Sequence, residues 1–449
     1  MDRNAFIREL LNRGSARGVT SEVCFQTGSS FEAEVKDGEL LQYNVADSAG
    51  LGFRVLKDGR TGTASTQILD DEALDQLVEG ALENAALVES KDEQFMFPGS
   101  ERYPELKLYN PEIDAIPASE KIDMALRLEK LALSLDPRVT QTEGCSVFSS
   151  TGEARLTNTL GLDVSSKSSL LGGYVSVVAR DREAVNTGMK VFFTMNPAEI
   201  DLEAVARAAV SEAVDGLGGA PVASGKYRVL LRRDVAGVML RTFAGIFSAD
   251  NAQRGLSRLK GREGEIIAAD CVTIMDDPHR AGSAASTPFD GEGVATYVKP
   301  IINNGRLETL LHNLKTAKKQ GVQTTANASR ASYAAPVGIA PTNFYFVPSE
   351  TGFDDMLTQL GDGLLITDLQ GMHAGANAIT GDFSLAARGF VVEGGKIGHA
   401  VSQITVAGNY YQLLKDIETV GADLEFRVPG GSCFGSPSLI VKGLSVAGT

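Results

Sequence analysis

The chain has 449 residues with 57 acidic and 42 basic side chains, so its formal net charge is −15. Such an acidic surface repels nucleic acid and anionic lipid, and we expect no nucleic-acid partner and no membrane partner. The length predicts two or three domains of ordinary globular composition, and no apolar run reaches the roughly 18 residues that a membrane-spanning helix requires.

The N-terminal 90 residues predict a small mixed unit. Apolar residues at helical spacing predict an amphipathic helix over residues 3–16, and a second helix is expected over 71–88, with acidic residues in its first turn. Between them, alternating patterns separated by Asp-Gly turns predict short strands over 22–26, 31–36 and 51–57. The polar, proline-containing stretch 90–117 is interpreted as a linker or an irregular crossover.

A second α/β unit is expected over residues 118–220. A helix capped by Ser119 is predicted to run to Leu135, where Asp136-Pro137 ends it. Strands follow over 147–150, 153–158, 164–171 and 174–180, and a helix over 197–217. The Gly-rich run 216–221 is the best domain boundary in the chain, so we predict an N-terminal domain at 1–220, with candidate subdomains 1–90 and 118–220, and a C-terminal domain at 225–449.

The C-terminal half is predicted to be rich in short strands. They are expected over 271–276, 343–347, 389–393, 424–428 and 438–441, with one helix over 351–361. A further helix over 234–250, with Asp234 as its N-cap, is expected to pack on them. The Lys-rich residues 315–319 are interpreted as a solvated helix face. The fold class is therefore α+β, with an N-terminal α/β domain built on an antiparallel sheet and a β-rich C-terminal domain.

Several Gly- and Asn-rich clusters recur in a fixed order along the C-terminal half. They are residues 290–296, 302–307, 317–321, 325–330, 341–343, 381–384 and 393–397, with weaker matches at 50–55 and 59–62. Each alone is a common turn pattern, but their order and spacing over about 220 residues resemble the TldD/PmbA family, whose older label is modulator of DNA gyrase.

The resemblance implies a metal motif that this chain lacks. TldD-like members carry a His-Glu-x-x-x-His zinc motif, and the aligned positions here hold Arg241, Thr242 and Ile246. Arginine stays protonated, isoleucine has no lone pair and threonine is too weak a base to activate water, so these three degenerate positions cannot support zinc catalysis. Gly245 is kept from the motif. Histidines five residues apart lie about 140° apart on a regular helix, so we expect a local distortion there.

Other metal or nucleophile sites are poorly supported by the sequence. The histidines 279, 312, 373 and 399 have no partner at helical spacing, and the run 276–279 is better interpreted as a turn. Cys433 lies near the position of the third zinc ligand in TldD-like members and is interpreted as a relic or a buried thiol. The four cysteines are far apart, which is typical of a reducing cytoplasm, and no Gly-x-Ser-x-Gly elbow is present.

A binding role remains. The polar turns around residues 324–330 and 371–377 are candidates to line a cleft for an extended peptide, with Asn327, Arg330, His373 and Asn377 as contacts. The alternative for each residue is an ordinary β-turn.

The resemblance places the chain on the PmbA/TldE side of the family. It implies a non-catalytic subunit of a heteromeric, cytoplasmic metallopeptidase, with no cofactor in this chain, zinc in a TldD-like partner, and peptides as substrates. Two alternatives stay open: a self-sufficient peptidase with an unrecognised site, and a regulatory protein that binds gyrase or a toxin–antitoxin partner.

Overall fold

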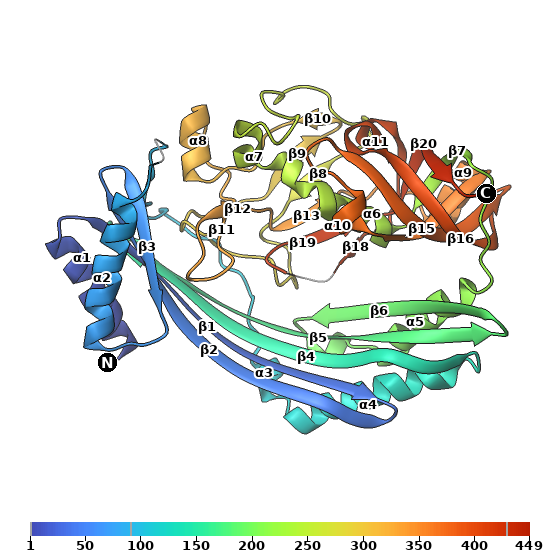
Figure 1. Ribbon diagram of the computed structural model, residues 1–449, viewed down its shortest axis with the longest axis horizontal. Helices are drawn as coiled ribbons and strands as arrows, with labels where there is room; N and C mark the ends of the chain where they lie inside the picture. Colours follow the sequence, from blue (N-terminus) through green and yellow to red (C-terminus); the bar gives the residue numbers. More distant parts are fainter. Residues whose placement is uncertain (1, 90–91, 428–429) are drawn as a thin grey trace.

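The computed structural model describes residues 2–89, 92–427 and 430–449. It has two parts: a long curved sheet with helices on its outer face, and a β-rich body that lies over the inner face of that sheet (Figure 1). The expected α+β class, with a β-rich C-terminal domain, is confirmed.

One antiparallel sheet spans the whole N-terminal domain. Its strand order is β3-β2-β1-β4-β5-β6, and its central strands are 17 to 20 residues long. The strands are β1 (Thr20–Lys36), β2 (Glu39–Lys57), β3 (Arg60–Thr66), β4 (Val139–Asn158), β5 (Asp163–Asp181) and β6 (Ala184–Thr194).

The predicted short strands were wrong in length. Residues 22–26 and 31–36 belong to one strand, as do 147–150 and 153–158, and 164–171 and 174–180. The run Gly28-Ser29-Ser30 has the composition of a turn, but it pairs in register with 46–48 on one side and 150–152 on the other. These ladders satisfy the backbone of a segment whose side chains favour a turn.

Two helical layers cover the same face of this sheet at its two ends. Near the N-terminus, α1 (Arg3–Ala16) and α2 (Asp71–Ala86) pack on Phe25 and Phe53. At the far end, α4 (Ala118–Leu135) and α5 (Leu202–Asp215) pack on Val147 and Val175. The two small cores are separate, although the sheet beneath them is continuous, so the division into subdomains stays a prediction.

Three local predictions require correction. Pro117, not Ser119, occupies the N-cap of α4, and it makes no side-chain cap bond. The predicted helix 197–217 begins as a short 3-10 turn (Pro197–Glu199), and α5 starts only at Leu202 with Asp201 as its cap. The stretch predicted as a linker contains one short helix, α3 (Pro111–Ala115), although residues 92–110 form no helix or strand, as expected. Ser90 and Lys91, which the predicted linker includes, lie outside the described residues.

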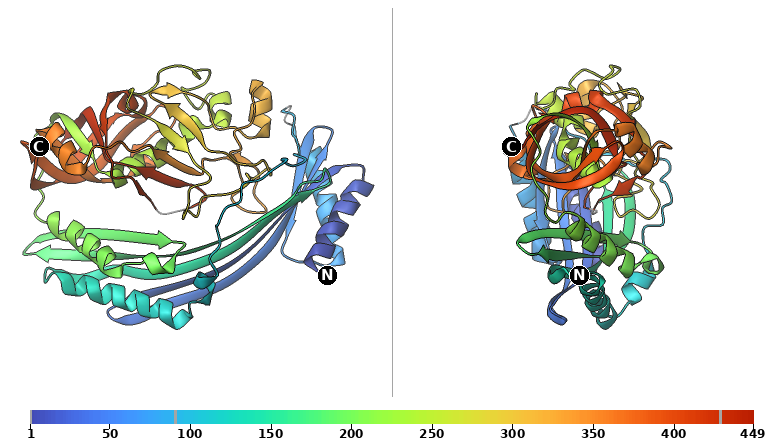
Figure 2. Two further views of the ribbon diagram at one scale, coloured as in Figure 1. Left: turned by 180° about the vertical axis from the view of Figure 1, so that it is seen from behind. Right: turned by 90° about the vertical axis from the view of Figure 1, so that its right-hand side faces the viewer.

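The C-terminal domain contains two six-stranded sheets. One has the order β10-β9-β8-β13-β19-β18 and the other β16-β15-β14-β7-β20-β17. An additional pairing of β16 with β20 closes the second sheet into a ring, visible end-on in the right-hand view of Figure 2. Apart from β18, the strands of these two sheets are β7 (Gly225–Leu231), β8 (Ile274–Asp276), β9 (Lys299–Asn303), β10 (Arg306–Leu307), β13 (Asn343–Phe346), β14 (Gly363–Gln370), β15 (Asp382–Glu393), β16 (Lys396–Asn409), β17 (Ile417–Val420), β19 (Cys433–Ser436) and β20 (Leu439–Ala447).

The remaining elements are short. They are α6 (Arg233–Phe243), a 3-10 turn (Ala244–Phe247), α7 (Ala249–Gln253), α8 (Leu314–Gln320), β11 (Ala328–Ser329), β12 (Gly338–Ile339), α9 (Phe353–Leu360), α10 (Met372–Gly375), α11 (Tyr410–Asp416) and β18 (Glu425–Phe426). The Lys-rich residues 315–319 belong to α8. Strand β18 falls inside the strand predicted over 424–428, of which Val428 lies outside the described residues. Among the described residues, no helix is long and apolar enough to span a membrane.

The two domains meet at a buried ion cluster. Glu22 of β1 is fully buried, and its Oε1 lies 3.0 Å from Nη2 of Arg54 on β2. Arg330 of the C-terminal domain also pairs with Glu22, and its Nε donates to the Gly291 carbonyl at 2.7 Å. Glu292 is buried close by and accepts the Leu314 N–H at 2.8 Å.

Two glycines of β2 allow this close contact. A side chain at Gly52 would place its Cβ 1.8 Å from the Tyr333 carbonyl oxygen, and one at Gly50 would lie 2.0 Å from the Tyr333 ring. The Gly-Leu-Gly run at 50–52, which resembles a nucleotide loop only superficially, therefore serves domain packing.

Arg330→Ala tests the ion cluster. The substitution leaves the buried Glu22 carboxylate with only Arg54 as a cationic partner, so we expect the free energy of unfolding to fall by about 3–5 kcal/mol. Arg207→Ala is the matched control, because its i,i+4 pair with Glu203 is largely exposed and is expected to contribute under about 0.5 kcal/mol. Chemical denaturation measures both; equal small effects would contradict a junction held by buried charge.

Candidate functional site

The degenerate motif lies at the end of α6, directly after β7. Arg232 occupies the N-cap position, so the prediction of Asp234 as N-cap was wrong. Asp234 lies in the first helical turn instead, where its two carboxylate oxygens accept bonds of 2.7 Å each from Nε and Nη2 of Arg232. This carboxylate is therefore occupied by an ion pair at the start of the helix.

The three motif positions do not converge on a common point. Arg241 is exposed, whereas Ile246 is fully buried in the domain core. The Thr242 hydroxyl donates to the Val238 carbonyl at 2.8 Å, one helical turn earlier. The Thr242 hydroxyl therefore makes its hydrogen bond within the helix.

The expected distortion at Gly245 is confirmed. Regular helix ends at Phe243, and residues 244–247 form a 3-10 turn. The Gly245 carbonyl accepts a bond from Nδ2 of Asn251 at 2.9 Å, and a Cβ at position 245 would lie 3.3 Å from that nitrogen. The helix is thus kinked at Gly245, between the motif positions 242 and 246.

The donor atoms near this helix do not fit a zinc ion. No group of three His, Cys, Asp or Glu residues with metal-binding geometry occurs in the described part of the chain. Cys433 on β19 is buried, burial raises the pKa of its thiol to about 11, and its Sγ donates to the Arg427 carbonyl at 3.3 Å. Zinc requires a thiolate with further imidazole or carboxylate ligands, so Cys433 alone cannot hold it.

The histidines lie apart from one another. His279 Nε2 is 3.1 Å from both the carbonyl and the hydroxyl of Thr296, and His312 is buried with its pKa lowered by burial. His373 and His399 are exposed. The neighbouring Asp276 is occupied by an ion pair of 3.0 Å with Lys299, which agrees with a structural turn at 276–279.

The four residues predicted to contact peptide fall into two distant settings. Asn327 is buried and donates to Asp276 Oδ2 at 2.7 Å, and Arg330 belongs to the ion cluster at the domain junction. His373 and Asn377 lie on the exposed segment around α10, where Asn377 Oδ1 accepts the N–H groups of residues 379 and 380. The structure does not bring the four together, because Asn327 and Arg330 make buried polar contacts inside the protein.

A cavity of about 370 Å³ lies beside the kinked helix. Its lining includes Gly245, Asn251, Asn313, Lys315, Ile339 and Phe434. Lys315 Nζ lies 3.3 Å from Asp250 Oδ1, so the charges at its rim are paired. This cavity lies next to the degenerate motif. Its polar lining consists mainly of side-chain amides and backbone groups rather than metal ligands.

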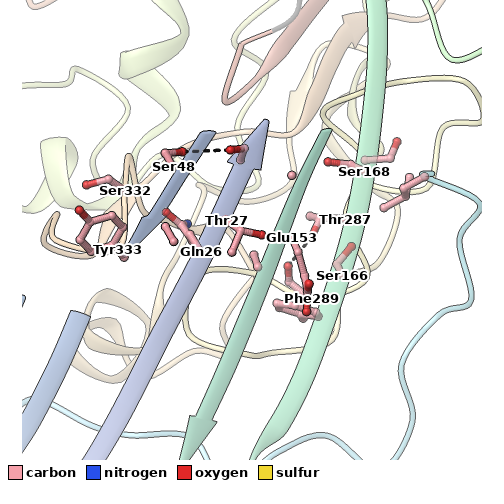
Figure 3. A pocket seen from close by; sticks show the side chains of 16 residues that line it. Gln26, Thr27, Ser48, Glu153, Ser166, Ser168, Thr287, Phe289, Ser332 and Tyr333 are labelled. Carbon is pink, nitrogen blue, oxygen red and sulfur yellow. Dashed lines mark hydrogen bonds between the residues drawn. The ribbon is translucent and has the colours of Figure 1, made fainter. Parts of the chain in front are cut away.

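A second cavity, the inter-domain pocket, lies between the inner face of the long sheet and the C-terminal domain (Figure 3). It holds about 450 Å³. Its floor is a row of cross-strand neighbours with hydroxyls at the ends and two glycines in the middle: Ser48, Gly28, Gly152 and Ser168. A Cβ on Gly28 would meet only Ser48 Oγ and the Thr151 carbonyl within 4 Å, and one on Gly152 only the Thr27 carbonyl.

The wall of the inter-domain pocket comes from the C-terminal domain. Phe289 and Tyr333 supply aromatic rings, and Ser286, Thr287 and Ser332 add hydroxyl-bearing residues. Of the lining side chains only Glu153 carries a charge, and Arg3 lies 3.5 Å from it. Such a site suits an uncharged, extended segment that presents backbone amides and an apolar side chain.

Sequence reasoning missed this pocket. The available signal was the presence of Gly28 and Gly152 inside long strands, since a strand glycine often marks a place where another backbone or a ligand comes close. That signal was hidden because both runs were interpreted as turns between short strands.

Thiol labelling tests the environment of Cys433. Among the four cysteines Cys271 is exposed, whereas Cys24, Cys145 and Cys433 are buried, and burial raises the thiol pKa of all four. We expect a thiol reagent at neutral pH to modify Cys271 alone in the folded chain and all four after unfolding, as mass spectrometry would show. Rapid labelling of Cys433 in the folded chain would contradict its place in the core.

The chain is similar to known proteins over most of its length. Three family models match in order: PmbA/TldA metallopeptidase domain 1 over residues 21–85, the central domain over 111–217 and the C-terminal domain over 224–448. The metalloprotease PmbA of Escherichia coli O157:H7 is 31% identical over 435 residues, covering 93% of this chain and 90% of that protein. The metalloprotease PmbA homolog of Haemophilus influenzae is 31% identical over 422 residues, covering 91% and 89%.

Solved structures agree with this match. A Thermotoga maritima protein named as a candidate modulator of a DNA gyrase has 35% identity and a TM-score of 0.92, covering 99% of this chain and 100% of that one. TldE from Thermococcus kodakarensis has the same fold at 22% identity, with a TM-score of 0.90 and coverage of 99% and 100%. The chain belongs to the PmbA/TldD family of metallopeptidase-related proteins.

Proposed function

We propose that this chain is the non-catalytic subunit of a heteromeric metallopeptidase, in which a TldD-like partner carries the zinc and this chain helps to hold extended peptides. One observation carries the proposal: the helix that would bear the zinc ligands keeps its kink but presents Arg241, Thr242 and Ile246. The scaffold of the site is kept and its chemistry is absent.

The chemistry of these side chains supports the proposal. The Arg241 guanidinium offers no lone pair to a metal, and its positive charge repels a divalent cation. Ile246 is fully buried, and its side chain has no atom that can bind a metal. The described residues contain no group of three His, Cys, Asp or Glu side chains that could hold a metal ion. A zinc-dependent reaction therefore needs ligands from another chain.

The alternative of a self-sufficient peptidase has less support. A cysteine nucleophile needs a low thiol pKa and a nearby base, whereas burial raises the thiol pKa of all four cysteines. Regulation of gyrase or of a toxin–antitoxin partner is the other alternative, and the protein that co-purifies with this chain distinguishes it from the proposal.

Reconstitution tests the proposal. We expect the purified chain alone to bind less than a tenth of an equivalent of zinc and to leave an unfolded peptide uncut, because it lacks the ligand set. Adding the TldD-like protein of the same cell is expected to give zinc-dependent cleavage and a stable complex. Cleavage by this chain alone, or co-purification of gyrase in place of a TldD-like protein, would overturn the assignment.

The variant Arg241→His/Thr242→Glu/Ile246→His is the matched control. We expect it to stay inactive and zinc-free, because positions 241 and 246 do not face a common point and the supporting polar groups are missing. It is also expected to lose more than about 2 kcal/mol of stability, since Ile246→His places an imidazole in an apolar core. Zinc-dependent cleavage by this variant would show that the site is only superficially degenerate.

Filling the inter-domain pocket tests its part in holding peptide. Gly152→Thr adds a side chain over the bare floor, and threonine suits a strand, so the fold should keep its stability. We expect the Kd for a labelled, uncharged, unfolded peptide to rise about tenfold, which corresponds to about 1.4 kcal/mol. Ser165→Thr, an exposed position on β5, is the control and should leave the Kd unchanged. Equal affinity of both variants for the peptide would contradict peptide binding in the inter-domain pocket.

A further inference from the structure

The outer edge of the long sheet is open along half of β2. Strand β3 pairs only with residues 51–57 of β2, and residues 42–49 pair with β1 alone. We call Gln42–Ala49 the open edge. All eight of its residues are exposed, and the described residues place no other strand against it.

The open edge has few of the features that normally protect an edge strand, and Asp47 is its one charged residue. Natural edges carry lysine, proline or a bulge, or are covered by another element, because free N–H and C=O groups recruit other strands. Residues 42–49 contain no lysine, arginine or proline, and their register with residues 27–34 is unbroken. The one irregularity on this strand pair lies at the hairpin end, beside Glu34 and Val35.

An apolar ledge lies beside the open edge. Tyr43 and Val45 are 57% and 62% exposed, and they lie on the face that α4 covers further along the sheet. Phe31, the cross-strand partner of Val45, is already buried, with Lys121 of α4 5.2 Å from its ring centroid. The apolar surface beneath α4 therefore continues from the buried Phe31 to the exposed side chains of Tyr43 and Val45.

Part of the opposite edge of the same sheet faces the C-terminal domain. Met189 and Val191 of β6 line a cavity together with Arg427 and Phe426 of the C-terminal domain, and Lys190 pairs with Glu425 across it. The C-terminal domain therefore approaches part of one edge, whereas no strand of the described residues lies against residues 42–49 at the other edge.

Charge selects the kind of strand that fits the open edge. Asp47 lies on it, Glu32 and Glu34 lie on the adjacent strand, and no basic residue accompanies them between 38 and 53. A second copy of this chain would bring the same acidic residues and its own share of a net charge of −15 against them. A partner strand with basic or neutral residues at these positions is favoured instead.

We propose that the open edge is the docking strand for the TldD-like subunit, which adds an extended strand to β2 and buries Tyr43 and Val45. The added strand would pair its backbone with residues 42–49 and place apolar side chains on the ledge. This inference rests on the proposed function, because it takes its occupant from the heteromeric assembly.

Val45→Lys tests the docking strand. Lysine at an edge opposes strand addition, and the exposed position keeps the free chain as stable as the wild type. We expect the Kd of the complex with the TldD-like protein to rise at least tenfold in sedimentation experiments. Val185→Lys, at a valine on β6 that is 51% exposed, is the control and should change the Kd less than twofold.

Hydrogen exchange separates strand addition from contact through side chains alone. The backbone amides of residues 42–49 should exchange at least tenfold more slowly in the complex than in the free chain. Failure of the wild-type chain to form any complex would overturn the proposed function. A complex in which these amides stay unprotected would overturn only the docking strand, and a homodimer of this chain that protects them would overturn the choice of partner.

Discussion

The buried contact between Glu22, Arg54 and Arg330 sets the geometry on which the rest of the molecule depends. It joins adjacent strands of the long sheet to a loop of the C-terminal domain, in a place that water does not reach. A charge buried in this way is stable only with its partners in place, so the contact fixes one relative position of the two domains. The side-chain-free strip at Gly50 and Gly52 lets Tyr333 complete the same junction.

The inter-domain pocket follows from this junction. Because the C-terminal domain is anchored near one end of the sheet, its loops carrying Phe289 and Tyr333 are held over the bare backbone of Gly28 and Gly152. The kinked end of α6 lies elsewhere in the C-terminal domain, within its large core. The chain thus shares the fold of the PmbA/TldD family, while two of its degenerate motif positions hold the buried Ile246 and the exposed Arg241.

Much of this architecture could be predicted from sequence, and the failures have physical causes. The helix over 3–16, the β-rich second half and the kink at Gly245 follow from local patterns and from the order of the Gly- and Asn-rich clusters. The long strands could not be predicted, since Gly28-Ser29-Ser30 has a local preference for a turn that is overridden by neighbours on both sides. The roles of Asn327 and Arg330 were equally hidden, because only the fold reveals that they meet Asp276 and Glu22 in the interior.

The central claim is that the metal of the assembly belongs entirely to the other chain. It is tested most directly by the zinc content, from native mass spectrometry, of a complex between the wild-type chain and a TldD-like protein whose motif histidines are replaced by alanine. The account predicts that this complex still assembles and contains no zinc, whereas the unmodified complex holds one zinc for each TldD-like chain. One equivalent of zinc retained in this mutant complex would contradict it.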